Sequence, residues 1–230
     1  MTKSDIVPAI YAGLQREIAE VVEAARVTTS RSVNALMTAT YWEVGRRIVV
    51  FEQGGEERAA YGDALIRRLG ADLSQRFGRG FGGRNLAQMR AFYLAWPADR
   101  IVQTLSAISD GSPLASAVAP HGLELGTVAQ AFPFPWSAYV RLLSLKTPTA
   151  RAFYETEALR EGWSVRQLDG QIGSQLYERL ALSRNKAVLL RKAVGVEPGD
   201  LPTPEEAIRD PFVLEFLDLK VGRFSYADAG

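Results

Sequence analysis

The fold is decided by residues 63–96, which read DALIRRLGADLSQRFGRGFGGRNLAQMRAFYLAW. Apolar side chains recur at every third or fourth position on both sides of a glycine-rich centre, which is the period of an amphipathic helix. Glycines at 78, 80, 82 and 83 interrupt this period and end the first helix. The pattern predicts a helix over 63–77, a glycine turn and a second helix over 83–96, an arrangement of the helix-turn-helix type.

The second helix of this pair carries polar side chains at its start. Burying its apolar positions leaves Arg84, Asn85 and Gln88 exposed in the first turns, where recognition helices contact base edges in the major groove. No acidic residue occurs between Leu73 and Ala98, and glycine-rich backbone beside a helix N-terminus suits phosphate. The candidate DNA contacts are Arg76, Arg79, Arg84, Asn85, Gln88 and Arg90.

Two other interpretations of this region compete with DNA binding. Helical hairpins with arginines also occur in proteins that never touch DNA, so a protein-interaction module stays open. Residues 78–83 also satisfy G-x-G-x-x-G, with Asp99 further along the chain. A dinucleotide site needs those glycines directly after a strand, whereas a leucine-bearing helix precedes them here, so this second interpretation is rejected.

Charge is distributed unevenly along the 230 residues, although the formal net charge is only +1. Residues 58–100 hold eight arginines against three aspartates, and residues 195–219 hold seven acids against one arginine. A basic centre followed by an acidic end indicates a segment that binds a polyanion, followed along the chain by a segment with a different role.

Composition excludes several other classes of function. The chain has no cysteine and a single histidine, His121, so we expect neither disulfides nor a metal site. No apolar run approaches the roughly 20 residues of a membrane span, and acidic residues interrupt the N-terminus where a signal peptide would be apolar. We therefore expect a soluble, cytoplasmic protein that does not contact membranes.

The remainder of the chain is predicted to be mainly α, a helical bundle around the helix-turn-helix element. Apolar stripes over 14–25 and 33–51 indicate helices before the glycine pair at 54–55. Residues 98–135 are rich in Ser, Gly and Pro, so we expect loops there, and a short strand pair at 101–108 is left open as an alternative.

Capping residues mark the helices of the C-terminal half. Thr147 stands before Pro148, and Ser164 is followed three positions later by Gln167, which are the residue types of an N-cap and a capping box. One apolar face then continues over 168–180, so we expect a single helix there. Its two internal glycines are expected to be sites of close packing.

Residues 41–97 and 133–186, taken as two long ungapped blocks, closely resemble the N-terminal domain of the YhcG-type nuclease family of bacteria. The resemblance implies a helical, winged-helix-like DNA-binding domain, which in that family precedes a PD-(D/E)xK nuclease domain. Gly83 departs from the family pattern, because relatives often carry a larger polar or basic residue there.

The C-terminal residues resemble two separate parts of the same family. Residues 210–219 (DPFVLEFLDL) resemble the junction into the nuclease domain, and residues 217–230 (LDLKVGRFSYADAG) resemble a segment from inside it. We interpret this as an internal deletion in which Asp218 and Lys220 are vestigial members of a D-x-K motif. Residues beyond Pro202 are accordingly expected to add little stability, because the sheet that they would join is absent.

Taken together, these observations and the resemblance predict a DNA-binding domain over 1–194, followed over 195–230 by an acidic linker and a nuclease-domain remnant. We expect no catalysis and no cofactor in this chain, whereas the resemblance implies magnesium for intact relatives. The expected partners are DNA and an intact nuclease or restriction-type protein, and homo-oligomerisation is left open. The alternative function is docking on a nuclease, restriction or toxin partner.

Overall fold

The computed structural model describes residues 8–54, 62–108, 118–119, 122–182 and 211–217, and these are mainly α-helical, as predicted. The elements in chain order are α1 (Pro8–Glu52), α3 (Gly62–Phe77), the 3-10 helix η1 (Arg79–Phe81), α4 (Gly83–Ala95), α5 (Ala98–Ile108), β1 (Val118–Ala119), β2 (Gly122–Leu123), α6 (Leu125–Ala129), α7 (Trp136–Leu143), α8 (Pro148–Glu161), α9 (Val165–Gly173), α10 (Leu176–Leu182) and α13 (Pro211–Phe216). The two strands form a minimal antiparallel pair.

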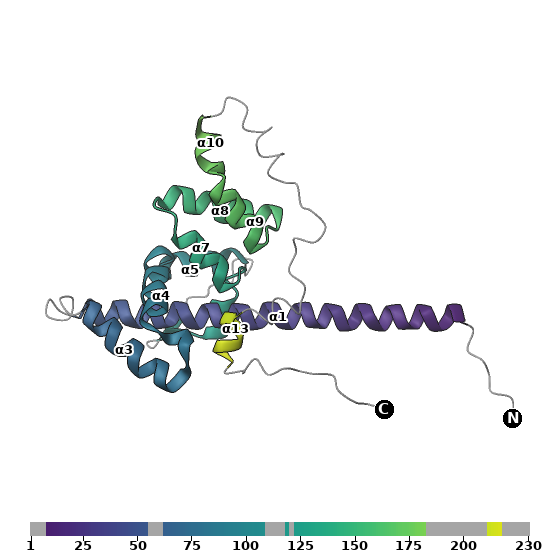
Figure 1. Ribbon diagram of the computed structural model, residues 1–230, viewed down its shortest axis with the longest axis horizontal. Helices are drawn as coiled ribbons and strands as arrows, with labels where there is room; N and C mark the ends of the chain where they lie inside the picture. Colours follow the sequence, from purple (N-terminus) through teal and green to yellow (C-terminus); the bar gives the residue numbers. More distant parts are fainter. Residues whose placement is uncertain (1–7, 55–61, 109–117, 120–121, 183–210, 218–230) are drawn as a thin grey trace.

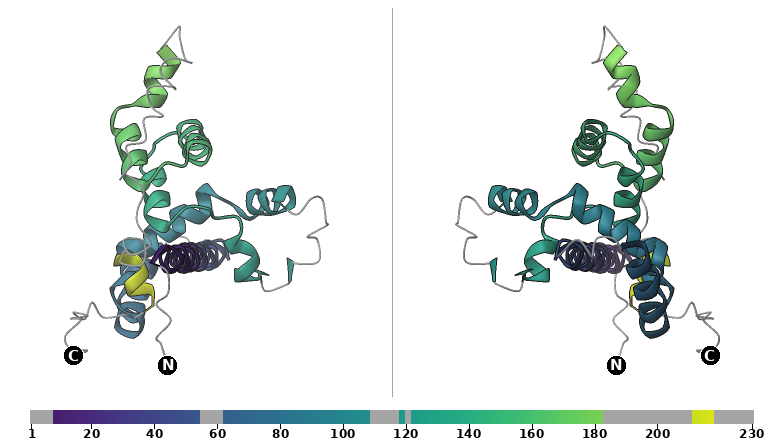
Figure 2. Two further views of the ribbon diagram at one scale, coloured as in Figure 1. Left: turned by 90° about the vertical axis from the view of Figure 1, so that its right-hand side faces the viewer. Right: turned by 90° about the vertical axis from the view of Figure 1, so that its left-hand side faces the viewer.

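Helix α1 is the axis of the molecule. It is one continuous helix of 45 residues, where two apolar stripes had been predicted separately. Its C-terminal half packs against α4, α6, α7 and α13, with α3 packed on α4, whereas its N-terminal half extends beyond them (Figure 1). In a view along α1, α13 and α3 lie on one side and α6 on the other, with α7 to α10 stacked above (Figure 2).

The backbones of helices α1 and α4 lie in close contact at Gly45. A Cβ atom there would overlap the carbonyl oxygen of Met89 and would lie 2.7 Å from its carbonyl carbon. Neither is a flexible side-chain atom, so only glycine allows the two helix backbones this close.

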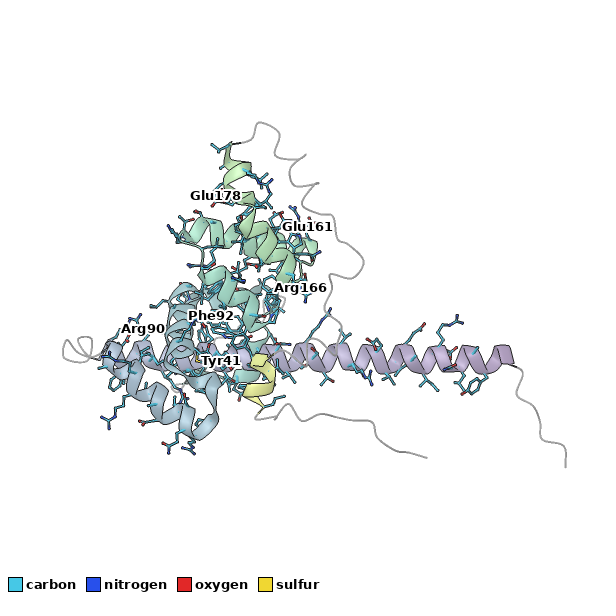
Figure 3. The ribbon with its side chains drawn as sticks, viewed as in Figure 1. Tyr41, Arg90, Phe92, Glu161, Arg166 and Glu178 are labelled. Atoms are coloured by element: carbon cyan, nitrogen blue, oxygen red, sulfur yellow. The ribbon has the colours of Figure 1, made fainter. Side chains whose placement is uncertain are left out.

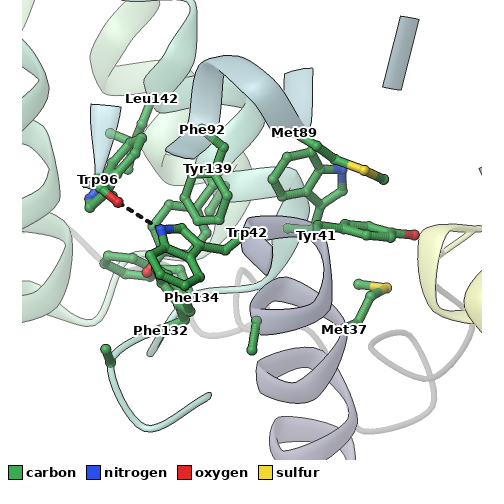
Figure 4. Packing of buried hydrophobic residues seen from close by; sticks show 14 of the residues in the cluster. Met37, Tyr41, Trp42, Met89, Phe92, Trp96, Phe132, Phe134, Tyr139 and Leu142 are labelled. Carbon is green, nitrogen blue, oxygen red and sulfur yellow. Dashed lines mark hydrogen bonds between the residues drawn. The ribbon is translucent and has the colours of Figure 1, made fainter. Parts of the chain in front are cut away.

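The core is an aromatic cluster between α1, α4 and α7 (Figure 4). The Phe92 ring lies at its centre, with centroids of Trp96, Phe132, Trp136 and Tyr139 between 4.8 and 5.3 Å away. The aromatic pairs Tyr41-Trp42 and Phe92-Tyr93 belong to this core rather than to a surface on which bases could stack. Tyr41, Trp42 and Phe92 are buried, and Tyr93 is half-buried. The indole Nε1 of Trp42 donates a hydrogen bond to the carbonyl of Trp96 at 2.6 Å (Figure 4).

The prediction of loops over 98–135 was wrong at both ends of that range, and no strand pair forms at 101–108. Residues 98–108 form α5, which buries Ile101 and Leu105 on one face, four residues apart. Residues 125–129 form α6, which packs on α1. Ile101, Leu105 and Ile108 follow one another at spacings of four and three, so this segment carries a clear helical period inside a region rich in Ser, Gly and Pro.

The capping predictions in the C-terminal half are confirmed. The Thr147 side chain accepts a hydrogen bond from Ala150 N at 3.3 Å with Pro148 in the first turn, and Ser164 with Gln167 forms a reciprocal capping box. The single helix over 168–180 is wrong, because α9 ends at Gly173 and Gln175 takes a positive φ of 53° before α10. No close packing occurs at the internal glycines, since a Cβ at either would meet nothing within 4 Å.

Helix α13 docks on the body, contrary to the expectation that residues beyond Pro202 have no surface to join. Val213 is buried, and the Phe216 ring meets the Tyr41 ring edge-on at 5.9 Å between centroids. The helix contacts α1 and η1, so its apolar face covers core surface beside the glycine turn (Figure 1).

Candidate nucleic-acid interface

The predicted helix, glycine turn and helix are present with nearly the predicted bounds. Gly78 has a φ of +88°, a conformation that favours glycine, and it ends α3. Helix α4 begins after Gly82, which has an extended backbone and no side chain to cap the helix. A Cβ at Gly70 would lie 2.6 Å from the backbone nitrogen of Gly83, so α3 and the start of α4 touch at this point.

The winged-helix description applies less well than the helix-turn-helix description. Within the described ranges α5 directly follows α4, and the β1–β2 pair comes only after α5. No hairpin is therefore seen in the position of a wing. At Gly83 an added Cβ would find its nearest neighbour, the Ile66 carbonyl oxygen, at 3.7 Å, which leaves room for the larger residue of the family pattern.

Asn85 was predicted to be exposed at the start of the second helix, and this is wrong. The side chain is buried, its Nδ2 donates to the carbonyl oxygen of Gly80, and its Oδ1 accepts from the indole Nε1 of Trp136 at 3.2 Å. Asn85 faces η1 and α7 rather than solvent because α7 covers this side of α4. Its amide holds the glycine turn, α4 and α7 together.

Arg90, another predicted DNA contact, forms an ion pair within the protein. Its Nε donates to both carboxylate oxygens of Glu52, at 2.7 and 3.0 Å, and so joins α4 to the end of α1 (Figure 3). The Glu52 side chain is only 10% exposed. A carboxylate at that depth needs a partner, so Arg90 has a structural role whether or not it also touches a phosphate.

Four arginines of the basic centre point to solvent. Arg67, Arg68, Arg76 and Arg84 are all exposed, and no ion pair found in the described part of the chain uses them. The guanidinium of Arg76 lies over the Phe77 ring at 4.9 Å from its centroid.

Two candidate DNA contacts, Gln88 and Arg79, are not among these four exposed arginines. Gln88 is half-buried one turn after Arg84, and the Arg79 side chain lies outside the described part of the structure. Arg100, which also belongs to the basic centre, is paired with Glu155 at 2.6 Å.

An open groove of about 960 Å³ runs between the end of α1, the start of α3 and α4. Its lining contains three arginines, Arg67, Arg84 and Arg90, against one carboxylate, Glu52. Because Glu52 is already bound to Arg90, the groove presents an excess of positive charge. Arg67 was not among the predicted contacts. The position of Arg67 in the arginine-rich stretch 58–100 could have indicated it as a contact, but only the fold brings it to the same groove as Arg84.

The described residues contain no cluster of three or more metal-ligating side chains. Asp218 and Lys220, the predicted remnants of a catalytic motif, lie outside these residues. Among the helices that the structure describes, none is long and apolar enough to cross a bilayer.

The fold and the basic surface together define a mainly helical module built around a helix-turn-helix-like element. The chain belongs to the family described as the DUF1016 N-terminal domain, whose pattern matches residues 17–179. It is 53% identical over 216 residues to the Escherichia coli (strain K12) protein named "Putative nuclease YhcG", which confirms the resemblance seen in the sequence.

That alignment covers 91% of this chain and 56% of the relative, so the chain spans about half the length of the curated relative that it matches. No solved structure matches the chain.

Proposed function

We propose that this chain binds duplex DNA, as the N-terminal DNA-binding module of a nuclease of the PD-(D/E)xK type. The observation that carries the proposal is the set of exposed arginines around the glycine turn and the first turn of α4. Arg90 and Arg100 are neutralised by carboxylates, whereas Arg67, Arg76 and Arg84 remain available to a polyanion.

The start of α4 supports phosphate binding at this place. The first-turn N–H groups of a helix have no partner within the helix, and Gly82 supplies no side-chain acceptor for them. A phosphate can take that position, where the helix dipole also favours negative charge. Arg84 adds a guanidinium in the same turn, and Gln88, one turn later, is the side chain placed to reach a base edge.

Catalysis belongs, in this proposal, to the nuclease domain of longer relatives, which would use magnesium. Such chemistry needs carboxylates that share the metal and a lysine near the attacking water. We expect no magnesium-dependent cleavage of linear, nicked or single-stranded DNA by this chain. Cleavage that disappears in Lys220→Ala would contradict this assignment.

The test of DNA binding is fluorescence anisotropy with duplex DNA at several salt concentrations. We compare wild type with Arg67→Ala, Arg76→Ala and Arg84→Ala, alone and combined. Each lost phosphate contact should flatten the slope of log affinity against log salt by about 0.9. Arg166→Ala is the matched control, because Arg166 is exposed on α9, away from the groove (Figure 3).

The alternative function, docking on a nuclease, restriction or toxin partner, predicts the opposite result. If wild type binds DNA no more tightly than the triple variant, the arginines serve no nucleic acid and the docking interpretation is favoured.

A further inference from the structure

The N-terminal half of α1 carries an apolar stripe that no described element covers (Figure 3). Tyr11, Leu14, Ile18 and Val21 follow one another at spacings of three, four and three, and Val22 lies beside them. These five side chains are between 44% and 69% exposed. Apolar residues at alternating spacings of three and four form the seam of a helix pair rather than an ordinary solvent face.

Beyond Val21 the same spacing continues through Ala25, Thr28 and Ser32, so the seam extends over about three heptads. The two hydroxyl groups do not oppose burial. Thr28 Oγ1 donates to the carbonyl of Ala24 at 2.8 Å, and Ser32 Oγ donates to the carbonyl of Thr28 at 3.0 Å. Since both donors are satisfied by the helix itself, a second helix could cover them without leaving a polar group unpaired.

The seam points away from the rest of the molecule. The residues of α1 that meet the body, such as Asn34, Thr38 and Tyr41, are buried on another face. At 3.6 residues per turn the two faces lie roughly 170° apart. Leu36 continues the seam where the body begins and is still 44% exposed. Ala39, one heptad after Ser32, is fully buried by the body, so the part of the seam that a second helix can cover ends before that residue.

We propose that the seam binds a second copy of this chain as an antiparallel helix pair. The charged residues that flank the seam indicate both which helix binds there and in which orientation. Glu17 and Arg31 are exposed on the same flank, two heptads apart. In an antiparallel pair, flank residues of this type face each other, so Glu17 lies beside Arg31 of the second copy, twice by symmetry. A parallel pair would place Glu17 beside Val22 instead.

The antiparallel register also pairs the seam residues consistently. Ile18 faces Thr28 of the second copy, Val21 faces Ala25, and the two Val22 side chains meet near the two-fold axis. The interface is isologous and closed, so the pair does not extend into a filament.

Sedimentation equilibrium of the full chain between about 1 and 100 µM tests the pairing. Wild type should approach twice the chain mass of 25.2 kDa as concentration rises, and Val21→Glu should stay monomeric. Ala19→Glu introduces the same charge outside the seam, roughly 120° around this exposed helix, and should dimerise like wild type. A wild type that is monomeric throughout, or a dimer that Val21→Glu leaves intact, overturns the proposal.

A charge exchange tests the orientation in the same assay. Glu17→Arg and Arg31→Glu should each weaken self-association by on the order of ten-fold, because each converts two attractive contacts into repulsive ones. An equimolar mixture of the two variants should regain wild-type association, whereas Glu23→Arg, on the opposite face, should have little effect. Failure of the mixture to recover would refute the antiparallel arrangement.

Discussion

Replacing Asn85 with alanine should destabilise the fold rather than act on DNA alone. The amide of Asn85 bonds to the Gly80 carbonyl and to the Trp136 indole, whose ring is fully buried. In Asn85→Ala both partners lose their bond without gaining water, and each such loss costs about 1–2 kcal/mol. The expected loss of unfolding free energy is therefore about 2–4 kcal/mol. For a chain of this length that corresponds to a thermal midpoint lowered by roughly 4–16 °C.

Urea and thermal unfolding, followed by circular dichroism and tryptophan fluorescence, measure this effect. Asn85→Asp keeps an acceptor for Trp136 but places an unpaired buried carboxylate against the Gly80 carbonyl oxygen, so at neutral pH its stability should be no higher than that of the alanine variant. Arg84→Ala is the neighbouring control, which should change stability by less than about 0.5 kcal/mol because Arg84 is exposed. If Asn85→Ala unfolds like wild type yet alters the DNA sequence preference, Asn85 is a base contact and the structural argument fails.

Three further predictions concern the packing of α1. Gly45→Ala should lower the free energy of unfolding by about 1–3 kcal/mol through overpacking. Gly13→Ala, where an added Cβ meets no atom within 4 Å, should raise it by up to about 1 kcal/mol. Equal unfolding midpoints for the two variants would contradict the α1–α4 contact. Phe216→Ala should cost about 1–2 kcal/mol, less than a fully buried phenylalanine, and an unchanged urea midpoint would show that α13 does not dock. Burial raises the pKa of Glu43, but hydrogen bonds from Arg46 and Arg47 outweigh this effect, so the pKa in the folded protein is lowered. The ionised Glu43 therefore stabilises the fold above about pH 4.5, and this contribution is lost as the pH falls through the pKa of the folded state. Glu43→Gln should therefore flatten the acid limb of stability against pH, and an unchanged limb would refute the assignment.

Much of the local structure could be predicted from the sequence. The helix, glycine turn and helix, the cap at Thr147 and the capping box at Ser164 all depend on residues within a few positions of one another. Helix α5 could have been predicted from the helical spacing of Ile101, Leu105 and Ile108, but the Ser, Gly and Pro residues of 98–135 favoured a loop there. The docking of α13 could not be predicted, because its apolar face needs a surface that distant residues build.

The sequence by itself determined the family, the helical class and the positions of the arginines, since these follow from order and spacing along the chain. The roles of those side chains were decided only by the tertiary structure. Asn85 meets Trp136 across 51 positions, Arg90 meets Glu52 across 38, and Arg100 meets Glu155 across 55. Burial and a buried partner determine whether a polar side chain supports the fold or remains available to a ligand. Both depend on which segments the packing of α1 against α4 and α7 brings together.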